Sequence, residues 1–394
     1  MNPELDLLQP YPFEKIRVLL DGITPADKPY IALSVGEPKH AAPQFVLDAL
    51  VEKLRGVENY PSTRGSEELR TSIANWLTKR FSLDNPDKLA ASQILPVNGT
   101  REALFAIAQC VLDRSQNSRD VLMPNPFYQI YEGATLLAGC KPVFYNISAA
   151  GDSDINAITD EQFKSCQLFY LCNPGNPTGS VLSMDALTRL INKAHEHNFY
   201  IVSDECYSEI YRTSAGAPVG LLEAAHAMGN TSYKHCLVFH SLSKRSNLPG
   251  MRSGFIAGDE QVIKQFLLYR TYHGCSMSPP VQHASAIAWQ DEKHVEENRL
   301  AYDQKYDAVL PILKPVMQVE KPDAGFYLWP TLSVEDTVFT QTMLREQNVA
   351  LVPGSYLGRE VNGINPGAAQ VRLALVAPLD ECIDAANRLV SALT

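Results

Sequence analysis

The chain has 394 residues and a net charge of −10, from 34 basic and 44 acidic side chains. Hydrophobic residues make up 45% of it and charged residues 20%, which excludes a disordered chain and supplies a large core. No basic block is present, which argues against a nucleic-acid partner, because that affinity comes from Lys and Arg neutralising phosphates. The length predicts two or three domains.

The eight cysteines show no C-x-x-C spacing, and several lie in apolar runs such as Cys236–Phe239. We therefore expect reduced thiols in a cytoplasmic protein. The first ten residues carry two acids and no base, so they predict no signal peptide. No apolar stretch approaches the roughly 18–20 residues that span a membrane. His195 and His197 would face different sides of a helix, so we expect no metal site.

Seven short apolar runs, separated by helical segments, predict the strands of one central sheet. The runs are nearly continuous rather than alternating, as expected for strands covered by helices on both faces. Alternation of strand and helix predicts an α/β fold with a mostly parallel sheet. The predicted strands are Ile94–Val97, Val121–Met123, Pro142–Tyr145, Leu168–Leu171, Tyr200–Ser203, Leu237–His240 and Phe255–Ala257.

Two helices between these strands have clear starting signals. Ser66 precedes an apolar stripe that begins at Leu69, and Ser183 precedes one that begins at Leu187. A serine at this position predicts a helix N-cap, because its hydroxyl accepts a hydrogen bond from a free backbone N–H of the first turn.

The pattern changes after about residue 285. A long charged helix is predicted over Glu292–Leu313, followed by short apolar runs at Gly325–Trp329, Val349–Val352 and Val371–Leu375 and by a final helix. This order predicts a smaller α+β domain. We expect residues 1–40 to pack with it, residues 41–285 to form the large domain, and residues 286–394 to form the small one.

Ligands of open α/β sheets bind at the carboxyl ends of the strands, so the loops there are where a site is expected. After Val97 comes Asn-Gly-Thr-Arg, which opens a helix. The backbone N–H groups of Gly99, Thr100 and Arg101 would point outward and receive an anion. Taken alone, this loop is better interpreted as a helix start without a ligand.

The second loop is Asn173–Gly179, directly after the strand that ends at Leu171. Its two prolines and two glycines define a rigid path, and its two Asn-Pro bonds offer sites for cis peptides that aim a side chain. The alternative is an ordinary turn.

The third loop, Ser203-Asp-Glu-Cys-Tyr, follows another buried strand. A buried acid is costly unless it meets a cation or a donor, so Asp204 could pair with a protonated ring nitrogen, and Tyr207 could reach the same ligand. Alternatively, Asp204 caps the next helix.

The fourth loop runs from Ser241 to Arg252 and contains two hydroxyls, Lys244 and, eight residues later, Arg252. Desolvation and neighbouring cations lower the pKa of a lysine in such a place, which suits it for a Schiff base. The hydroxyls and the arginine suit a phosphate ester. A lone lysine would otherwise be read as a surface charge.

Taken together, these motifs resemble the fold-type-I pyridoxal-phosphate enzymes, specifically the class I/II aminotransferases. The order N-G-T-R, N-P-F-Y, N-P-G-N-P-T-G, D-E-C-Y, S-L-S-K, G-M-R and R-L-A-L matches that family along essentially the whole chain. One departure is Ser253, where the family usually has an aliphatic residue, and we expect it to affect packing rather than chemistry.

The resemblance implies pyridoxal 5′-phosphate as cofactor and assigns its contacts. Lys244 would bind it covalently and move the substrate Cα proton, while Asp204 would keep its ring nitrogen protonated. Asn176 and Tyr207 would bind its phenolic oxygen, and Tyr128 would stack on its ring. The phosphate would be held by the remaining set: Ser241, Arg252, the backbone of Gly99, Thr100 and Arg101, and Tyr60 from the partner subunit.

The resemblance also implies a substrate site and an assembly. Arg372 would bind the substrate α-carboxylate, helped by Asn176 and the backbone of Gly36. The substrates would be an amino acid and a 2-oxo acid, with glutamate and 2-oxoglutarate as one pair. The family's active sites lie at a subunit interface, so a homodimer is expected.

Within the family, the segments Leu8–Arg17, Leu33–His40 and Ser243–Gly250 are most similar to N-succinyl-L,L-diaminopimelate aminotransferases of lysine biosynthesis (EC 2.6.1.17). A dicarboxylic side chain needs a cation beyond Arg372, and Lys39 and Arg17 are the weak candidates. Alternatives are another class I aminotransferase (aspartate, alanine or aromatic), a C–S β-lyase of the same fold, and a non-catalytic sensor.

Overall fold

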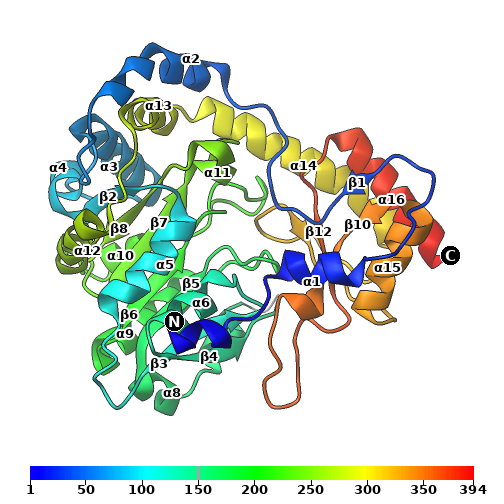
Figure 1. The fold of residues 1–394 in the computed structure, drawn as a ribbon. Helices are drawn as coiled ribbons and strands as arrows, with labels where there is room; N and C mark the ends of the chain where they lie inside the picture. Colours follow the sequence, from blue (N-terminus) through cyan, green and yellow to red (C-terminus); the bar gives the residue numbers. More distant parts are fainter. Residues whose placement is uncertain (149–150) are drawn as a thin grey trace.

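The computed structural model describes residues 1–148 and 151–394. It is built around a seven-stranded sheet with strand order β2-β8-β7-β6-β5-β3-β4 (Figure 1). The strands β3 to β7 are parallel to one another, while β8 runs antiparallel to both of its neighbours. The strands are β2 (Ile94–Val97), β3 (Asp120–Asn125), β4 (Lys141–Asn146), β5 (Cys166–Cys172), β6 (Tyr200–Asp204), β7 (Cys236–Ser241) and β8 (Gly254–Gly258). Each predicted strand lies within an observed one, so the prediction of a mostly parallel sheet is confirmed.

Helices cover both faces of this sheet, and alternate residues of a strand point to opposite cores. In β5, Leu168 and Tyr170 pack with one apolar cluster, whereas Phe169 and Leu171 pack with the other. One cluster is completed by α2, α3, α9, α10 and α13, and the other by α5, α6 and α12. The helices of this part are α2 (Gln44–Glu52), α3 (Glu67–Phe81), α4 (Pro86–Lys88), α5 (Thr100–Val111), α6 (Ile130–Leu137), α7 (Asp152–Asn156), α8 (Asp160–Ser165), α9 (Met184–His197), α10 (Leu221–Ala227), α11 (Leu242–Arg245), α12 (Glu260–His273) and α13 (Pro279–Gln290).

Both predicted N-caps are present. The Ser66 hydroxyl accepts a hydrogen bond from the Leu69 N–H at the start of α3, over 3.2 Å. The Ser183 hydroxyl accepts one from the Ala186 N–H at the start of α9, also over 3.2 Å. Each serine therefore satisfies one of the backbone donors that a helix start leaves free.

The C-terminal residues build a second, smaller core beside the sheet (Figure 1). The predicted long helix is α14 (Lys293–Leu313), which packs along α16. Each predicted apolar run of this part contains a short strand, and β9, β11 and β12 form an antiparallel sheet in the order β11-β12-β9. The remaining elements here are α15 (Asp336–Gln347), α16 (Leu379–Leu393), β9 (Tyr327–Leu328), β10 (Val349–Ala350), β11 (Val352–Pro353) and β12 (Val371–Ala374).

The first forty residues contact both parts of the molecule. The turn Pro3–Leu7 lies against α6 of the sheet part. In contrast, α1 (Pro12–Leu19) buries Ile16 against Val352 and Leu357, and β1 (Ile31–Ala32) pairs with β10 of the C-terminal part. Helix α13 packs on α2 and α3 of the sheet part, whereas α14 packs along α16 of the C-terminal part. The boundary between the two cores therefore lies between α13 and α14. The predicted domain limits stay a prediction.

No helix among residues 1–148 and 151–394 is long and apolar enough to cross a membrane.

Replacing Ser183 tests whether its hydroxyl stabilises the start of α9. Ser183→Ala leaves the Ala186 N–H without its acceptor, so we expect the free energy of unfolding to fall by about 1 kcal/mol, measured by urea denaturation. Ser391→Ala is the matched control, because that exposed hydroxyl only bonds back to the Asn387 carbonyl, and its effect should stay below about 0.5 kcal/mol. Equal losses in both variants would contradict the capping role.

Candidate active site

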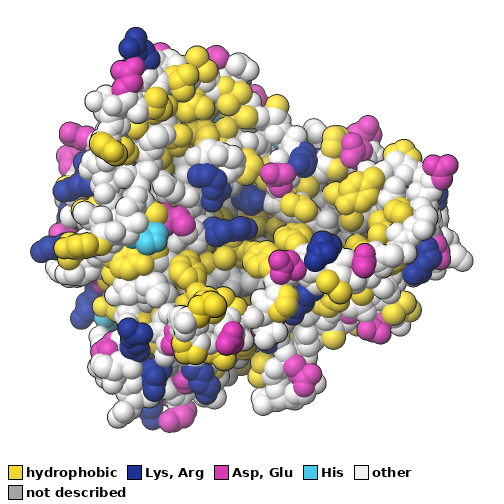
Figure 2. Space-filling view, viewed as in Figure 1, with side chains coloured by type: hydrophobic (Ala, Val, Ile, Leu, Met, Phe, Trp, Pro, Cys, Tyr) yellow, Lys and Arg dark blue, Asp and Glu magenta, His cyan; other side chains and the backbone are white. Residues whose placement is uncertain are grey.

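The four predicted loops meet at one edge of the sheet, where they line a cavity of about 530 Å³. Arg372 on β12 and the segment at Gly36 close it from the other side. Figure 2 shows Lys and Arg side chains gathered at the centre of this face, between the sheet part and the C-terminal part. The predicted site residues that line the cavity are Gly36, Thr100, Arg101, Tyr128, Asn176, Asp204, Tyr207, Ser241, Lys244, Arg252 and Arg372.

One end of the cavity is built to receive an anion. Gly99 precedes α5 with a φ of +84°, and the guanidinium of Arg252 lies so close that a Cβ on Gly99 would be 2.2 Å from its Nη2. The positive φ favours glycine at this position, and the absence of a side chain leaves room for the guanidinium. The Ser241 hydroxyl lies nearby at the end of β7 and accepts a hydrogen bond from the Ser243 N–H over 3.1 Å. A helix N-terminus, a guanidinium and hydroxyls together form an arrangement suited to a phosphate.

Asp204 lies deeper, at the end of β6, and is 6% exposed. It accepts hydrogen bonds from the Tyr131 hydroxyl (2.9 Å) and the Cys206 N–H (3.3 Å), and no Lys, Arg or His of the described chain lies within ion-pair distance of it. Burial raises the pKa of Asp204, while hydrogen bonds from the Cys206 thiol, the Tyr131 hydroxyl and the Cys206 N–H oppose that rise. The carboxylate therefore has room for a cationic partner, such as a protonated ring nitrogen.

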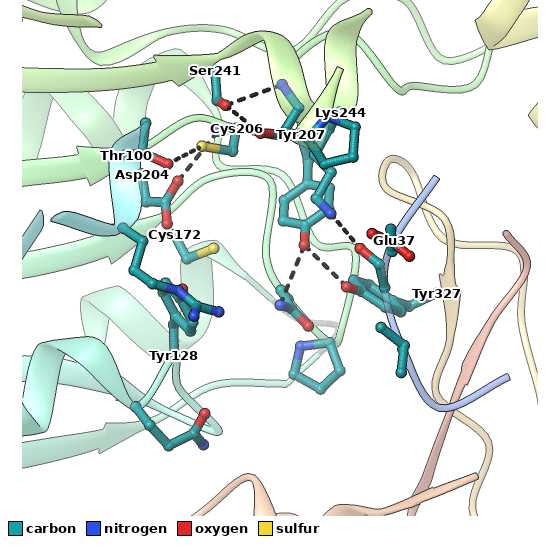
Figure 3. Close-up of a pocket in the computed structure, with 18 of the residues that line it drawn as sticks. Glu37, Thr100, Tyr128, Cys172, Asp204, Cys206, Tyr207, Ser241, Lys244 and Tyr327 are labelled. Atoms are coloured by element: carbon teal, nitrogen blue, oxygen red, sulfur yellow. Dashed lines mark hydrogen bonds between the residues drawn. The ribbon is translucent and has the colours of Figure 1, made fainter. Parts of the chain in front are cut away.

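Lys244 lies in the short helix α11, on the wall of the same cavity opposite Asp204 (Figure 3). Its Nζ donates a hydrogen bond to the Gly36 carbonyl. Burial lowers its pKa from 10.5 to about 8, and the nearby charge of Arg372 also lowers it. The amine is thus far more often unprotonated near neutral pH than a surface lysine would be.

Hydrogen bonds connect the residues predicted for the phenolic oxygen and for the substrate carboxylate. The Tyr207 hydroxyl lies 3.4 Å from Asn176 Nδ2 and 3.0 Å from the Tyr327 hydroxyl (Figure 3). Asn176 Oδ1 in turn accepts from Arg372 Nη1 over 3.2 Å, while Arg372 Nη2 donates to the Ser34 carbonyl over 2.9 Å. The Arg372 Nε is buried without a partner in the described chain.

Four predicted positions differ in how they meet the cavity, and the first, Gly99, does not line it, although the Arg252 guanidinium lies against it. The Tyr128 hydroxyl accepts a hydrogen bond from Arg101 Nε over 2.6 Å, so the Arg101 side chain lines the cavity in addition to its backbone. Tyr60 is fully exposed and does not line it, and its assignment to a partner's site stays a prediction. Ser253 is buried, pairs with the Ser285 hydroxyl over 2.7 Å and does not line the cavity.

Sequence reasoning missed two tyrosines of the site. Tyr131, three residues after Tyr128, is fully buried and supports Asp204, and Tyr327 bonds to Tyr207. Tyr131 lies in the first turn of α6, a helix that was not predicted, so no sequence pattern marked it. Tyr327 lies in the run Gly325–Trp329, and nothing in that apolar pattern distinguishes it from core.

The comparisons with known proteins agree with this geometry. The family model for aminotransferase class I and II matches residues 28–385. The chain belongs to the class I and II aminotransferases. An aminotransferase from Neisseria meningitidis has a similar solved structure, with a TM-score of 0.94 and 44% identity over 100% of both chains. A probable aminotransferase of Mycobacterium tuberculosis is 32% identical over 361 residues, covering 91% of this chain and 80% of the relative. An LL-diaminopimelate aminotransferase of Maridesulfovibrio salexigens is 26% identical, covering 98% and 97%.

These findings confirm the predicted fold class and the aminotransferase family, and class I/II aminotransferases depend on pyridoxal 5′-phosphate. The site of this aminotransferase fits that cofactor in three respects. The Gly99–Arg252 cradle suits its phosphate. Asp204 is a buried carboxylate without a cation in the described chain, and Lys244 is a desolvated amine on the opposite wall.

The lowered pKa of Lys244 gives a pH test. Only an unprotonated amine reacts with an aldehyde, so the rate at which the apoprotein combines with pyridoxal phosphate should rise with pH up to about 8 and level off above it. The visible absorbance of the bound cofactor would report this rate, and Lys244→Arg, which keeps the positive charge, should abolish the signal. A rate that still rises steeply at pH 10 would show an ordinary lysine instead.

Proposed function

We propose that the protein transfers an amino group between the glutamate/2-oxoglutarate pair and a dicarboxylic amino acid of the diaminopimelate type, with N-succinyl-L,L-diaminopimelate as its substrate in lysine biosynthesis. One observation carries the proposal. Besides Arg252, which is assigned to the phosphate, a cavity that joins Lys244 and Asp204 holds two guanidinium groups that no carboxylate of the described chain pairs with, those of Arg101 and Arg372.

In this proposal the chain's own residues hold and activate the cofactor. The bound cofactor supplies an electron sink that stabilises a carbanion at the substrate Cα. Lys244 Nζ, whose pKa burial lowers to about 8, takes the proton from Cα and later returns a proton. Asp204 holds a proton on the ring nitrogen, and Tyr131 and the Cys206 N–H keep its carboxylate in place. Asn176 and Tyr207 bind the phenolic oxygen.

Arg372 is proposed to bind the substrate α-carboxylate. Its guanidinium is held by Asn176 and by the Ser34 carbonyl and lies 4.5 Å from the centre of the Tyr327 ring. Its buried Nε has no partner in the described chain and is free to donate. A guanidinium held this rigidly binds a carboxylate with little loss of side-chain entropy.

The distal end of the substrate is proposed to meet Arg101. This side chain replaces Lys39 and Arg17, the two weak sequence candidates, because neither of them lines the cavity and Lys39 pairs with Glu37 over 2.6 Å. The Arg101 guanidinium lies 5.9 Å from the rings of Tyr11 and Tyr128. It therefore offers a charged donor for a second carboxylate.

The residues that line the cavity also argue against a free amino group at the distal end of the substrate. Two carboxylates line the described cavity, Asp204 and Glu37. Asp204 is assigned to the cofactor, and the hydrogen bond from Lys39 lowers the pKa of Glu37, so that its charge is already matched. A distal ammonium group would find no unpaired carboxylate, whereas an amide carries no charge that needs one. This favours an N-succinylated amine over free L,L-diaminopimelate.

A homodimer in the cytoplasm is part of the proposal. The segment around the turn Leu54–Glu58 exposes the apolar side chains of Val51, Leu54 and Val57, next to the fully exposed Tyr60. Such a patch is typical of a protein interface. A cytoplasmic location is supported by the eight cysteines, all of which are free thiols.

A substrate panel tests the proposal. With 2-oxoglutarate as acceptor, we expect kcat/KM for N-succinyl-L,L-diaminopimelate to exceed that for L,L-diaminopimelate, aspartate, alanine and aromatic amino acids by at least about a hundredfold, and Lys244→Ala to abolish turnover. A better rate with free L,L-diaminopimelate would overturn the substrate assignment. Pyruvate and ammonia formed without any keto-acid acceptor would indicate a β-lyase.

Arg101→Gln tests the distal contact. Loss of one charge-assisted hydrogen bond, about 1.5–3 kcal/mol, should lower kcat/KM for the succinylated substrate by roughly tenfold to a hundredfold and leave that for alanine nearly unchanged. Arg114→Gln is the matched control, since Arg114 is exposed and lies outside the cavity. An equal loss for both substrates would place Arg101 at the cofactor instead.

A further inference from the structure

Asn298 on α14 connects two segments that line the cofactor site, although it does not line the cavity itself. Its side chain is 6% exposed. Its Nδ2 donates to the Lys244 carbonyl over 3.3 Å, and its Oδ1 lies 3.1 Å from Asn247 Nδ2 and 2.7 Å from His40 Nδ1. One buried amide thus contacts the reactive-lysine loop twice and the N-terminal segment once.

The chemistry of the partners fixes how this amide is oriented. The Lys244 carbonyl can only accept, so the amide nitrogen of Asn298 faces it, and the amide oxygen faces Asn247 and His40. The His40 Nδ1 must then carry a hydrogen. The His40 ring also lies 4.7 Å from the ring of Tyr302, one turn further along α14, so its position is fixed from two sides.

The Lys244 carbonyl depends on this contact for a donor. Helix α11 has four residues, and the last carbonyls of a helix have no helical N–H to accept from. The following N–H groups of Ser246 and Leu248 both donate to the Leu242 carbonyl. The side chain of Asn298 therefore satisfies the main-chain oxygen of Lys244.

The other end of Lys244 meets the same N-terminal segment. Its Nζ donates to the carbonyl of Gly36, four residues before His40. Asn298 and the segment 36–40 thus hold Lys244 at its backbone and at its amine. We propose that Asn298 is a positioning residue, which sets the place of the Lys244 amine by fixing its backbone and the segment that it faces; this rests on the proposed function of Lys244.

Asn298→Leu tests this, because it keeps the volume of the side chain and removes all three hydrogen bonds; Asn298→Ala is the second variant. We expect kcat to fall by about tenfold to a hundredfold while KM for the amino donor stays within about twofold, since misplacement of a reacting group affects the chemical step. In the apoprotein, the pKa of Lys244, measured by the pH dependence of its acetylation, should rise by at least about half a unit toward 10.5 as water reaches the amine.

Gln347→Ala provides the matched control. Gln347 is another buried amide, and its Oε1 bonds Lys28 Nζ over 2.6 Å, so it also ties an N-terminal residue to a C-terminal helix, but away from Lys244. It should lower stability without moving the pKa of Lys244 or kcat. His40→Leu should reproduce part of the Asn298 effect, and the double variant should lose less than the product of the two single losses.

An unchanged pKa of Lys244 and an unchanged kcat in Asn298→Leu would overturn the proposal, as would effects no larger than those of Gln347→Ala. The acetylation measurement needs neither cofactor nor substrate. A wrong substrate assignment would therefore leave the shift in the pKa of Lys244 intact, and the two failures are distinguishable.

Discussion

The exclusion of water from the ε-amine of Lys244 is the constraint on which the rest of the site depends. Burial is the main reason that its pKa falls to about 8. The same burial raises the pKa of Asp204 on the facing wall. A buried amine and a buried carboxylate, held apart and each without an ionic partner in the described chain, form an unfavourable arrangement that a bound anion and a bound cation would relieve.

The two parts of the molecule contribute different halves of the site. The sheet part supplies Asp204, Lys244 and Arg252 from loops at the ends of its strands. The C-terminal part supplies Arg372 from β12 and Tyr327 from β9, and these two strands pair with each other. The hydrogen bond between Arg372 and Asn176 joins the halves. The substrate-facing surface is therefore sensitive to how the two cores sit against each other.

Much of the fold and several residues of the candidate site could be predicted from the sequence, because local sequence patterns determine them. Apart from β4 at the sheet edge, the strands are buried on both faces, so their apolar runs predicted them within a few residues, and serine caps marked α3 and α9. Motif order pointed to Lys244, Asp204 and Arg372, which line one cavity. Features that depend on contacts between segments far apart in the sequence could not be predicted. Asn298 lies 54 residues from Lys244 and 258 from His40, and nothing in its surroundings on a charged helix marks it.

The positively charged side chains considered for the distal end of the substrate illustrate the same limit. Lys39 and Arg17 were candidates because they lie in segments that resemble the family, yet neither lines the cavity. Arg101 was assigned through its backbone alone. Its side chain enters the cavity because the first turn of α5 directs it toward Tyr128, which follows another strand. A helix start predicted from sequence gives the backbone donors, but not the direction of the side chain.

The reversal of direction between β7 and β8 restricts how the chain can vary. These strands pair antiparallel with Ser241 opposite Gly254, so the segment between them leaves the sheet edge and returns to it. Ser241 and Arg252, near its two ends, line the same pocket, and Lys244 lies between them. An added or deleted residue in this segment would turn the amine or the guanidinium away from their shared target. We therefore expect related chains to keep the length of this segment constant, even where they tolerate single substitutions within it.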